Sequence, residues 1–172
     1  MNSADERLLV VKAQGGDREA IGQLWDLLTP KLYGYLLNTL RHRPLAEDIL
    51  QSTWLKAIEA LPKFQQKHIR VGSWLFAIAR NECRQHWRKS NREVGLNASL
   101  NELPSNTYID SENQILVEQM LAPLSEDDRE LIRLRYIADL PLNEIAKILN
   151  LNFVAVRVRL HRALTRAKSS LN

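Results

Sequence analysis

Apolar residues recur at intervals of three and four along most of this chain, which places them on one face of an α-helix. The strict alternation that marks β-strands is nearly absent. The spacing predicts helices over residues 5–14, 17–40, 45–61, 72–89, 113–122, 126–137, 141–149 and 153–171. Asp17 and Asn152 stand where helix N-caps are expected, and Pro141 suits a first helical turn. We therefore predict an all-α fold.

Residues 91–112 lack this periodicity and are rich in Asn, Ser, Gly and Pro, as linkers are. We predict two small helical domains, at 1–90 and 113–172, joined by a flexible acidic linker at 91–112. No apolar run approaches the roughly 18–20 residues that a membrane span requires. The first residues also lack the layout of a signal peptide. We expect no membrane insertion and a cytoplasmic location.

Charged residues fall into blocks, although the net charge is only +4. Five bases and one acid lie between residues 80 and 92. Residues 93–128 hold eight acids and no Lys or Arg, whereas residues 145–172 hold six bases and no acid. Each basic block, taken alone, fits an ordinary solvated helix face about as well as a binding site. Two such blocks within helical periods favour two sites for a polyanion such as nucleic acid.

Residues 141–164 have the pattern of a helix-turn-helix. Asn150 occupies the turn position that often needs a left-handed backbone, which Asn tolerates better than most residues. Asn152 can cap the second helix, and we predict that Leu151 fills the angle between the two helices. At about 100° per residue, one side of the second helix is apolar and is expected to be buried. That side comprises Val156, Leu160, Ala163, Leu164, Ala167 and Leu171.

The opposite side of this second helix suits the major groove of DNA. It presents Val154, Val158, His161 and Arg162, flanked by Arg157, Arg159, Arg166 and Lys168. Arg162 can donate to a guanine edge, and either valine can contact a thymine methyl group. The flanking bases can bind phosphates, which gives salt-dependent affinity without sequence information. We predict that these eight residues bind duplex DNA; the alternative is a surface helix of ordinary arginine content.

The chain also contains GDREAIGQLWDLLTPKLYGYL, AEDILQSTWLKAIEAL, WLFAIARNECRQHWRK and LRYIADLPLNEIAKILNLNFVAVRVRLHRAL, in this order. In order and spacing these segments resemble the extracytoplasmic-function (ECF) group of the sigma-70 family, the promoter-specificity subunits of bacterial RNA polymerase. The resemblance implies a region 2 domain at 1–90, which binds core polymerase and recognises and melts the −10 element. It implies a region 4 domain at 113–172 that reads the −35 element. The implied partners are core RNA polymerase (its clamp coiled coil and flap), promoter DNA and an anti-sigma factor.

The helix predicted at 45–61 has an apolar side and a mixed side. The expected core side comprises Leu50, Trp54, Ala57, Ile58 and Leu61. The other side presents Asp48, Gln51, Ser52 and Leu55. On it an exposed leucine, Leu55, lies beside an acid, Asp48, and an amide, Gln51. Without the resemblance, an ordinary amphipathic helix would be the better interpretation. With it, these three residues are expected to bind the clamp coiled coil.

The helix predicted at 72–89 carries a basic ridge with aromatic residues beside it. The ridge is formed by Arg80, Arg84 and Arg88, with Trp74 and Asn81 along one flank and Phe76 and Trp87 along the other. Cations interleaved with aromatic rings commonly hold single-stranded nucleic acid, although Trp74 and Trp87 fit a place in the core equally well. The resemblance assigns this helix and the loop at 64–72 to melted −10 DNA. One flipped base is then expected near Phe64, Lys67 and Asn81.

The resemblance also has consequences for the linker and for promoter choice. It implies that the acidic linker threads a polymerase channel that later carries RNA. Asn150 and Val154 stand where the family often has Gly, and Val158 stands where it often has Ser. The two valines make the predicted groove-facing surface larger and more apolar, so we expect an unusual −35 sequence.

Two other classes of function compete with a sigma factor. A response-regulator type of DNA-binding protein would need an α/β phosphoacceptor domain, and the N-terminal half lacks the alternation that builds one. An enzyme would need a phosphate loop, a nucleophile elbow or a metal cluster, and none is found. Cys83 and His86 are three residues apart on a helix, but two ligands alone do not make a zinc site. We predict no catalysis, no cofactor and no metal.

Overall fold

The computed structural model describes residues 3–65, 69–94 and 119–169, and every regular element within these ranges is helical. The chain divides into two compact units, Met1–Asn101 and Glu102–Asn172. The predicted linker beyond residue 94 and the helix predicted at 113–122, apart from its last residues, lie outside the described ranges. None of the described helices is long and apolar enough to cross a membrane.

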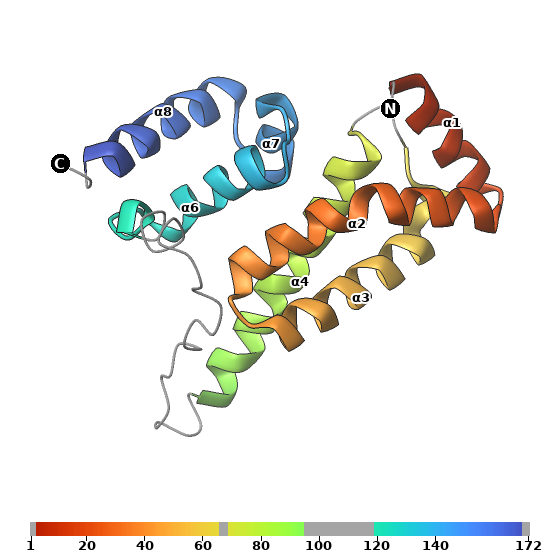
Figure 1. Ribbon diagram of the computed structural model, residues 1–172, viewed down its shortest axis with the longest axis horizontal. Coiled ribbons are helices and arrows are strands. Elements are labelled where there is room, and N and C mark those ends of the chain that lie inside the picture. Colours follow the sequence, from red (N-terminus) through yellow and green to blue (C-terminus); the bar gives the residue numbers. More distant parts are fainter. Residues whose placement is uncertain (1–2, 66–68, 95–118, 170–172) are drawn as a thin grey trace. The chain divides into compact units, whose positions relative to one another are not determined.

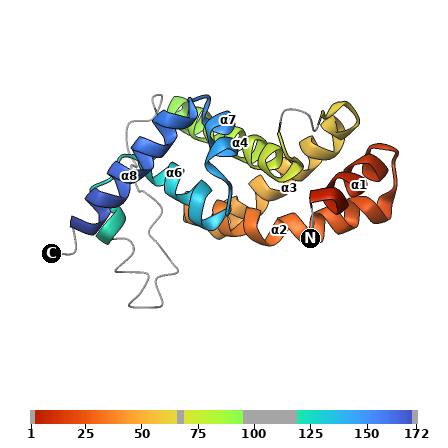
Figure 2. The ribbon, with the colours of Figure 1, turned by 90° about the horizontal axis from the view of Figure 1, so that it is seen from above.

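The first unit consists of α1 (Ser3–Gln14), α2 (Arg18–Leu40), α3 (Arg43–Ala60), the short 3₁₀ turn η1 (Leu61–Lys63) and α4 (Val71–Val94). Figure 1 and Figure 2 show α2, α3 and α4 lying side by side, with α1 against one end of α2. The predicted cap at Asp17 is confirmed: its carboxylate accepts the backbone N–H groups of Glu19 and Ala20 at 2.9 and 3.1 Å. Helix α4 runs four residues into the segment expected to be linker.

The core of the first unit lies among α2, α3 and α4. Tyr35 and Phe76 are fully buried and pack edge to face, with ring centroids 5.4 Å apart. Trp54 lies beside Trp25 and donates its indole N–H to the Thr29 hydroxyl at 3.0 Å. Such a donor must find a partner when the ring is buried. These contacts fix the three helices that carry the exposed surfaces described below.

The second unit consists of α6 (Glu126–Ile132), the π-helical segment η2 (Arg133–Ile137), α7 (Leu142–Leu149) and α8 (Phe153–Ser169). The helix predicted at 126–137 is therefore continuous but changes its hydrogen bonding at Arg133. Pro141 occupies the N-cap position, one residue before the predicted first turn. The buried residues of α8 are Val156, Leu160, Ala163 and Ala167, as predicted from the periodicity, and Leu164 is partly buried.

Candidate nucleic-acid and polymerase interfaces

Helices α7 and α8 form the predicted helix-turn-helix. Asn150 ends α7 in the left-handed conformation (φ 54°, ψ 46°), and its N–H donates to the carbonyl groups of Ala146 and Lys147. The Asn152 side chain accepts the backbone N–H of Ala155 at 2.7 Å, which confirms the predicted cap. The prediction for Leu151 was wrong: 37% of its surface is exposed. The backbone N–H of Leu151 bonds to Ala146 at 2.9 Å, so the turn is held by the backbone instead of by that side chain.

The outer face of α8 is exposed, as the periodicity predicted. Val154 is 67% exposed and Val158 is 42% exposed, and His161 and Arg162 are also exposed. Phe153, the first residue of α8, was not among the predicted site residues, and it is 48% exposed beside Val154. Exposed apolar side chains that are grouped on one face commonly mark a contact surface. The face is thus mixed, with apolar and basic side chains together.

The flanks of α8 differ in a way that the sequence did not reveal. Arg159 and Arg166 both donate to the carboxylate of Asp128, whose side chain is only 5% exposed. Asp127 adds a weaker contact to Arg159 at 3.3 Å. These bonds tie α8 to α6, so two of the predicted phosphate ligands also hold the domain together. Arg157 and Lys168, on the other flank, are exposed and pair with no acid within the described ranges.

The ionisation of Asp128 reflects this clamp. Burial by itself would raise the pKa of the carboxyl group, but hydrogen bonds from Arg159 and with Ser125, together with both arginine charges, lower it below its ordinary value. The same hydrogen bond raises the pKa of Arg159. Asp128 is therefore a carboxylate at neutral pH, and α8 is held to α6 by charged hydrogen bonds.

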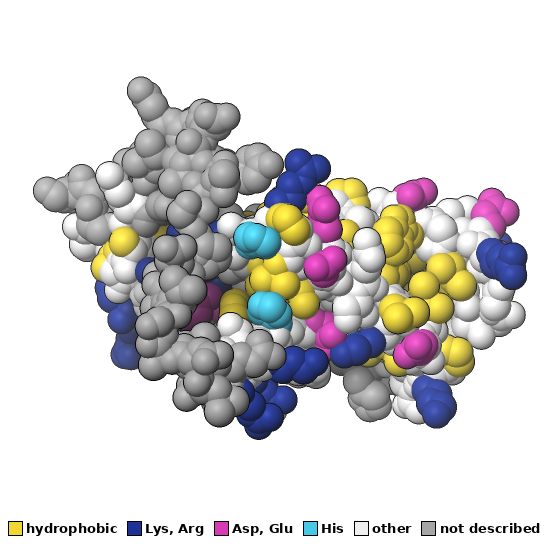
Figure 3. Space-filling model, turned by 90° about the horizontal axis from the view of Figure 1, so that it is seen from below, with side chains coloured by type: hydrophobic (Ala, Val, Ile, Leu, Met, Phe, Trp, Pro, Cys, Tyr) yellow, Lys and Arg dark blue, Asp and Glu magenta, His cyan; other side chains and the backbone are white. Residues whose placement is uncertain are grey.

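The outer side of α3 carries the residues predicted to bind polymerase. Asp48 and Gln51 are exposed, and Leu55 is 61% exposed. The predicted core side needs a correction, because Ile58 is 41% exposed. Helix α3 packs against both α2 and α4. The residues that it buries between them are Ala46, Ile49, Thr53, Trp54 and Ala57. Figure 3 shows one face of the first unit on which apolar side chains and carboxylates lie mixed together.

The basic ridge of α4 is only partly open to solvent. Arg84, Arg88 and Asn81 are exposed, whereas Arg80 is half-buried. Of the two aromatic residues on the far flank, Phe76 is 2% exposed and belongs to the core, and Trp87 is 37% exposed. The exposed stacking candidate beside the ridge is therefore Trp87, a residue for which the sequence left the choice between core and surface open.

Phe64 and Trp74 lie together just before and within the start of α4. Their rings stack with centroids 4.5 Å apart, and Phe64 is 9% exposed. The Gln14 side chain donates to the carbonyls of Leu61 and Phe64 at 3.0 and 2.7 Å, which ties α1 to this turn. Phe64 therefore packs against Trp74 and is nearly buried, so its ring is not freely exposed for stacking on a base. Lys67 lies outside the described residues.

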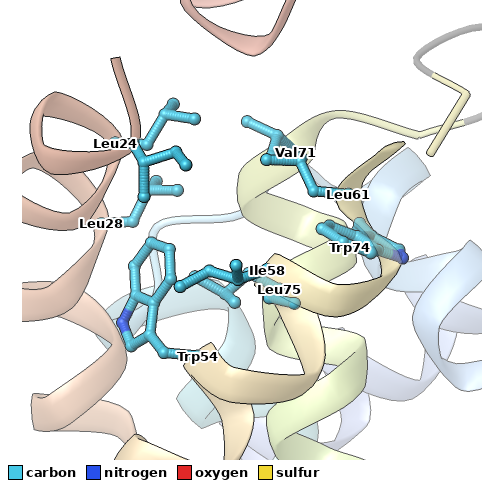
Figure 4. A pocket seen from close by; sticks show the side chains of 10 residues that line it. Leu24, Leu28, Trp54, Ile58, Leu61, Val71, Trp74 and Leu75 are labelled. Carbon is cyan, nitrogen blue, oxygen red and sulfur yellow. The ribbon is translucent and has the colours of Figure 1, made fainter. Parts of the chain in front are cut away.

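An apolar cleft opens between α2, α3 and α4, next to this stacked pair. Figure 4 shows Leu24 and Leu28 of α2, Trp54 and Ile58 of α3, and Trp74 of α4 turned toward one space. Its wall contains no polar surface, so it offers no group for acid–base or metal chemistry. Cys83 is buried in the core, and the described residues contain no group of three His, Cys, Asp or Glu that could hold a metal ion.

Comparison with known proteins identifies both units. The family model of sigma-70 region 2 matches residues 24–93, and that of sigma-70 region 4 matches residues 114–166. The chain is 28% identical over 157 residues to the ECF RNA polymerase sigma factor SigM of Bacillus subtilis, covering 88% of this chain and 95% of that protein. It is 26% identical over 170 residues to the ECF sigma factor BldN of Streptomyces coelicolor, covering 95% of this chain but only 64% of BldN.

Solved structures agree with these matches over most of the chain. CnrH, solved in complex with the cytosolic domain of CnrY, superimposes with a TM-score of 0.72 at 25% identity, covering 96% of each chain. The sigma factor RpoE from Bartonella quintana, solved with the anti-sigma factor NepR, superimposes with a TM-score of 0.71 at 28% identity, covering 87% of this chain and 95% of RpoE. Both regions are present in the family's order, and the chain belongs to the ECF group of the sigma-70 family, the non-enzymatic factors that initiate transcription by bacterial RNA polymerase.

Proposed function

We propose that this protein binds core RNA polymerase, directs it to a specific set of promoters and helps to melt their −10 element. The observation that carries the proposal is the outer face of α8, where apolar and basic side chains stay exposed on a capped helix-turn-helix. A helix of this kind fits the major groove, with Arg162 toward a base edge and Arg157 and Lys168 toward phosphates. The predicted target of this face is the −35 element.

The two outer surfaces of the first unit suit the remaining steps. On α3, Asp48, Gln51 and Leu55 form an exposed mixed surface of the kind that takes a protein partner. On α4, Arg84 and Arg88 present cations in a row, with Trp87 available for stacking. We assign polymerase binding to α3 and the melted −10 strand to α4. The domain roles correspond to residues 1–90 and 113–172, with 91–112 between them.

An anti-sigma factor is the proposed regulator. CnrH and RpoE were each solved with a protein partner, the cytosolic domain of CnrY and the anti-sigma factor NepR. The present chain superimposes on both over most of its length. Each of its two units carries a surface that is proposed to bind polymerase or DNA. A separate protein that covers one of these surfaces would therefore suffice to hold the chain inactive in the cytoplasm.

Transcription from core polymerase tests the proposal. Purified full-length protein is added to core RNA polymerase and a library of promoter fragments, and run-off products are sequenced. A sigma factor produces specific transcripts with core alone, whereas a conventional regulator requires another sigma subunit. Binding to core is measured separately, by pull-down without DNA. Failure to bind core in that pull-down would refute the proposal.

A further inference from the structure

A buried carboxylate lies between the two surfaces of the first unit. Glu82, on the inner side of α4, is 6% exposed. Its oxygens accept hydrogen bonds from the ammonium group of Lys56, at 2.6 Å each, and from the hydroxyl group of Ser52 at 2.8 Å. Both donors come from α3, so this contact joins α3 to α4. Neither the sequence pattern nor the proposed function uses it.

The position of this contact relates it to both surfaces. Ser52 and Lys56 each follow directly after a residue assigned to polymerase binding, Gln51 and Leu55. Glu82 follows directly after Asn81, on the helix whose outer side carries the basic ridge. A change in this contact therefore acts on α4 without altering any residue assigned to DNA or to polymerase.

The sign of the charge on Glu82 is unfavourable for the neighbouring ridge. Between residues 80 and 92 it is the one acid among five bases. A buried charge is poorly screened by salt and must be paired. Lys56 supplies that pairing, and its own side chain remains 45% exposed. Without the ammonium group, the carboxylate would repel a polyanion bound along α4. The hydrogen bonds between Glu82 and Lys56, which join α4 to α3, would also be lost.

We propose that Lys56 is a positioning residue for nucleic acid: it neutralises the buried Glu82 carboxylate and holds it against α3, which lets the basic ridge of α4 act at full strength. This inference rests on the proposed function of α4. A carboxylate about 10 Å from a bound phosphate weakens the affinity for nucleic acid roughly two- to fifteenfold, for effective dielectric constants between about 80 and 20. We therefore expect loss of Lys56 to weaken promoter binding about fivefold.

Three variants of the full chain separate charge from structure: Lys56→Met, Glu82→Gln and the double variant. Lys12→Met, an exposed lysine on α1 outside the assigned surfaces, is the matched control for loss of one positive charge. Each variant is assembled with core polymerase and titrated with a selected promoter fragment that carries a pre-melted −10 bubble. Core affinity is measured in parallel with labelled protein. Tryptophan fluorescence in urea confirms that each variant is folded.

The expected result is an asymmetry between the two single variants. Lys56→Met weakens bubble binding about fivefold, Glu82→Gln binds as tightly as wild type or more tightly, and the double variant returns to wild type. A purely structural bridge would make both single variants equally weak, and that result would overturn the inference. If Lys56→Met does not fold, weak binding by Glu82→Gln or by the double variant overturns it equally. Wild-type protein that binds neither core nor promoter would refute the proposed function itself.

Discussion

Replacing Asp128 by Asn should loosen the attachment of α8 to α6 and leave the first unit intact. Asp128 is 5% exposed in its side chain and accepts hydrogen bonds from both Arg159 and Arg166. A hydrogen bond to a charged group contributes roughly 1.5–3 kcal/mol. The two arginines are 35% and 55% exposed, so water can replace part of what they lose. We expect a loss of roughly 2–3 kcal/mol in the free energy of unfolding of the second unit.

The placement of the tryptophans allows this loss to be assigned to one unit. All four tryptophans of the chain, Trp25, Trp54, Trp74 and Trp87, lie in the first unit. Their fluorescence therefore reports unfolding of that unit, while circular dichroism reports the helices of both. With a urea dependence of about 1 kcal/mol/M for a small domain, Asp128→Asn should lower the midpoint of the second unit's transition by about 2–3 M. The fluorescence midpoint should not move.

A control substitution and a change of pH test the physical reason. Asp127 is 75% exposed in its side chain, so Asp127→Asn should change stability by less than about 0.5 kcal/mol. The pKa of Asp128 lies below its ordinary value of about 3.9. Its contribution is therefore complete above about pH 4 and is lost as the pH falls through the lowered pKa. Equal midpoints for wild type and Asp128→Asn at pH 7 would refute the reasoning, and so would a difference between them that widens as the pH falls below about 4.

Three further predictions concern the binding surfaces. Asp48→Ala should weaken core binding by about 1–3 kcal/mol, the cost of truncating one of the few residues that dominate an interface. Direct binding of duplex −35 DNA should stay the same, which a gel shift without polymerase checks. Arg162→Ala should reduce discrimination among −35 sequences by roughly 1–3 kcal/mol. Lys168→Ala should instead weaken binding to all sequences evenly and lower the slope of log K against log salt by about one. Unchanged discrimination in Arg162→Ala would show that Arg162 does not contact a base. Replacing thymine by uracil in the −35 element should cost wild type about 0.8 kcal/mol per contacted methyl but cost Val158→Ser less, and equal losses in competition binding would exclude a methyl contact by Val158.

The sequence by itself determined the features that depend on neighbouring residues. The helical class follows from spacing within single helices, and the caps at Asp17 and Asn152 bond to N–H groups two or three residues away. The left-handed turn at Asn150 is equally local. The exposed face of α8 was predictable as well, because four buried apolar residues on one side of a helix leave the opposite side in water.

The tertiary structure alone decided which polar groups pair and which apolar groups stay exposed. Asp128 meets Arg159 and Arg166 across 31 and 38 residues, and Glu82 meets Lys56 across 26, so no periodicity relates the partners. Ile58 lies at the edge of the apolar side of α3, where the packing of α2 and α4 decides whether it is covered. Periodicity predicts which side of a helix is apolar, but the width of the buried arc depends on the neighbours that pack against it. For that reason the structure, and not the sequence, separated the arginines that hold α8 in place from those left to meet DNA.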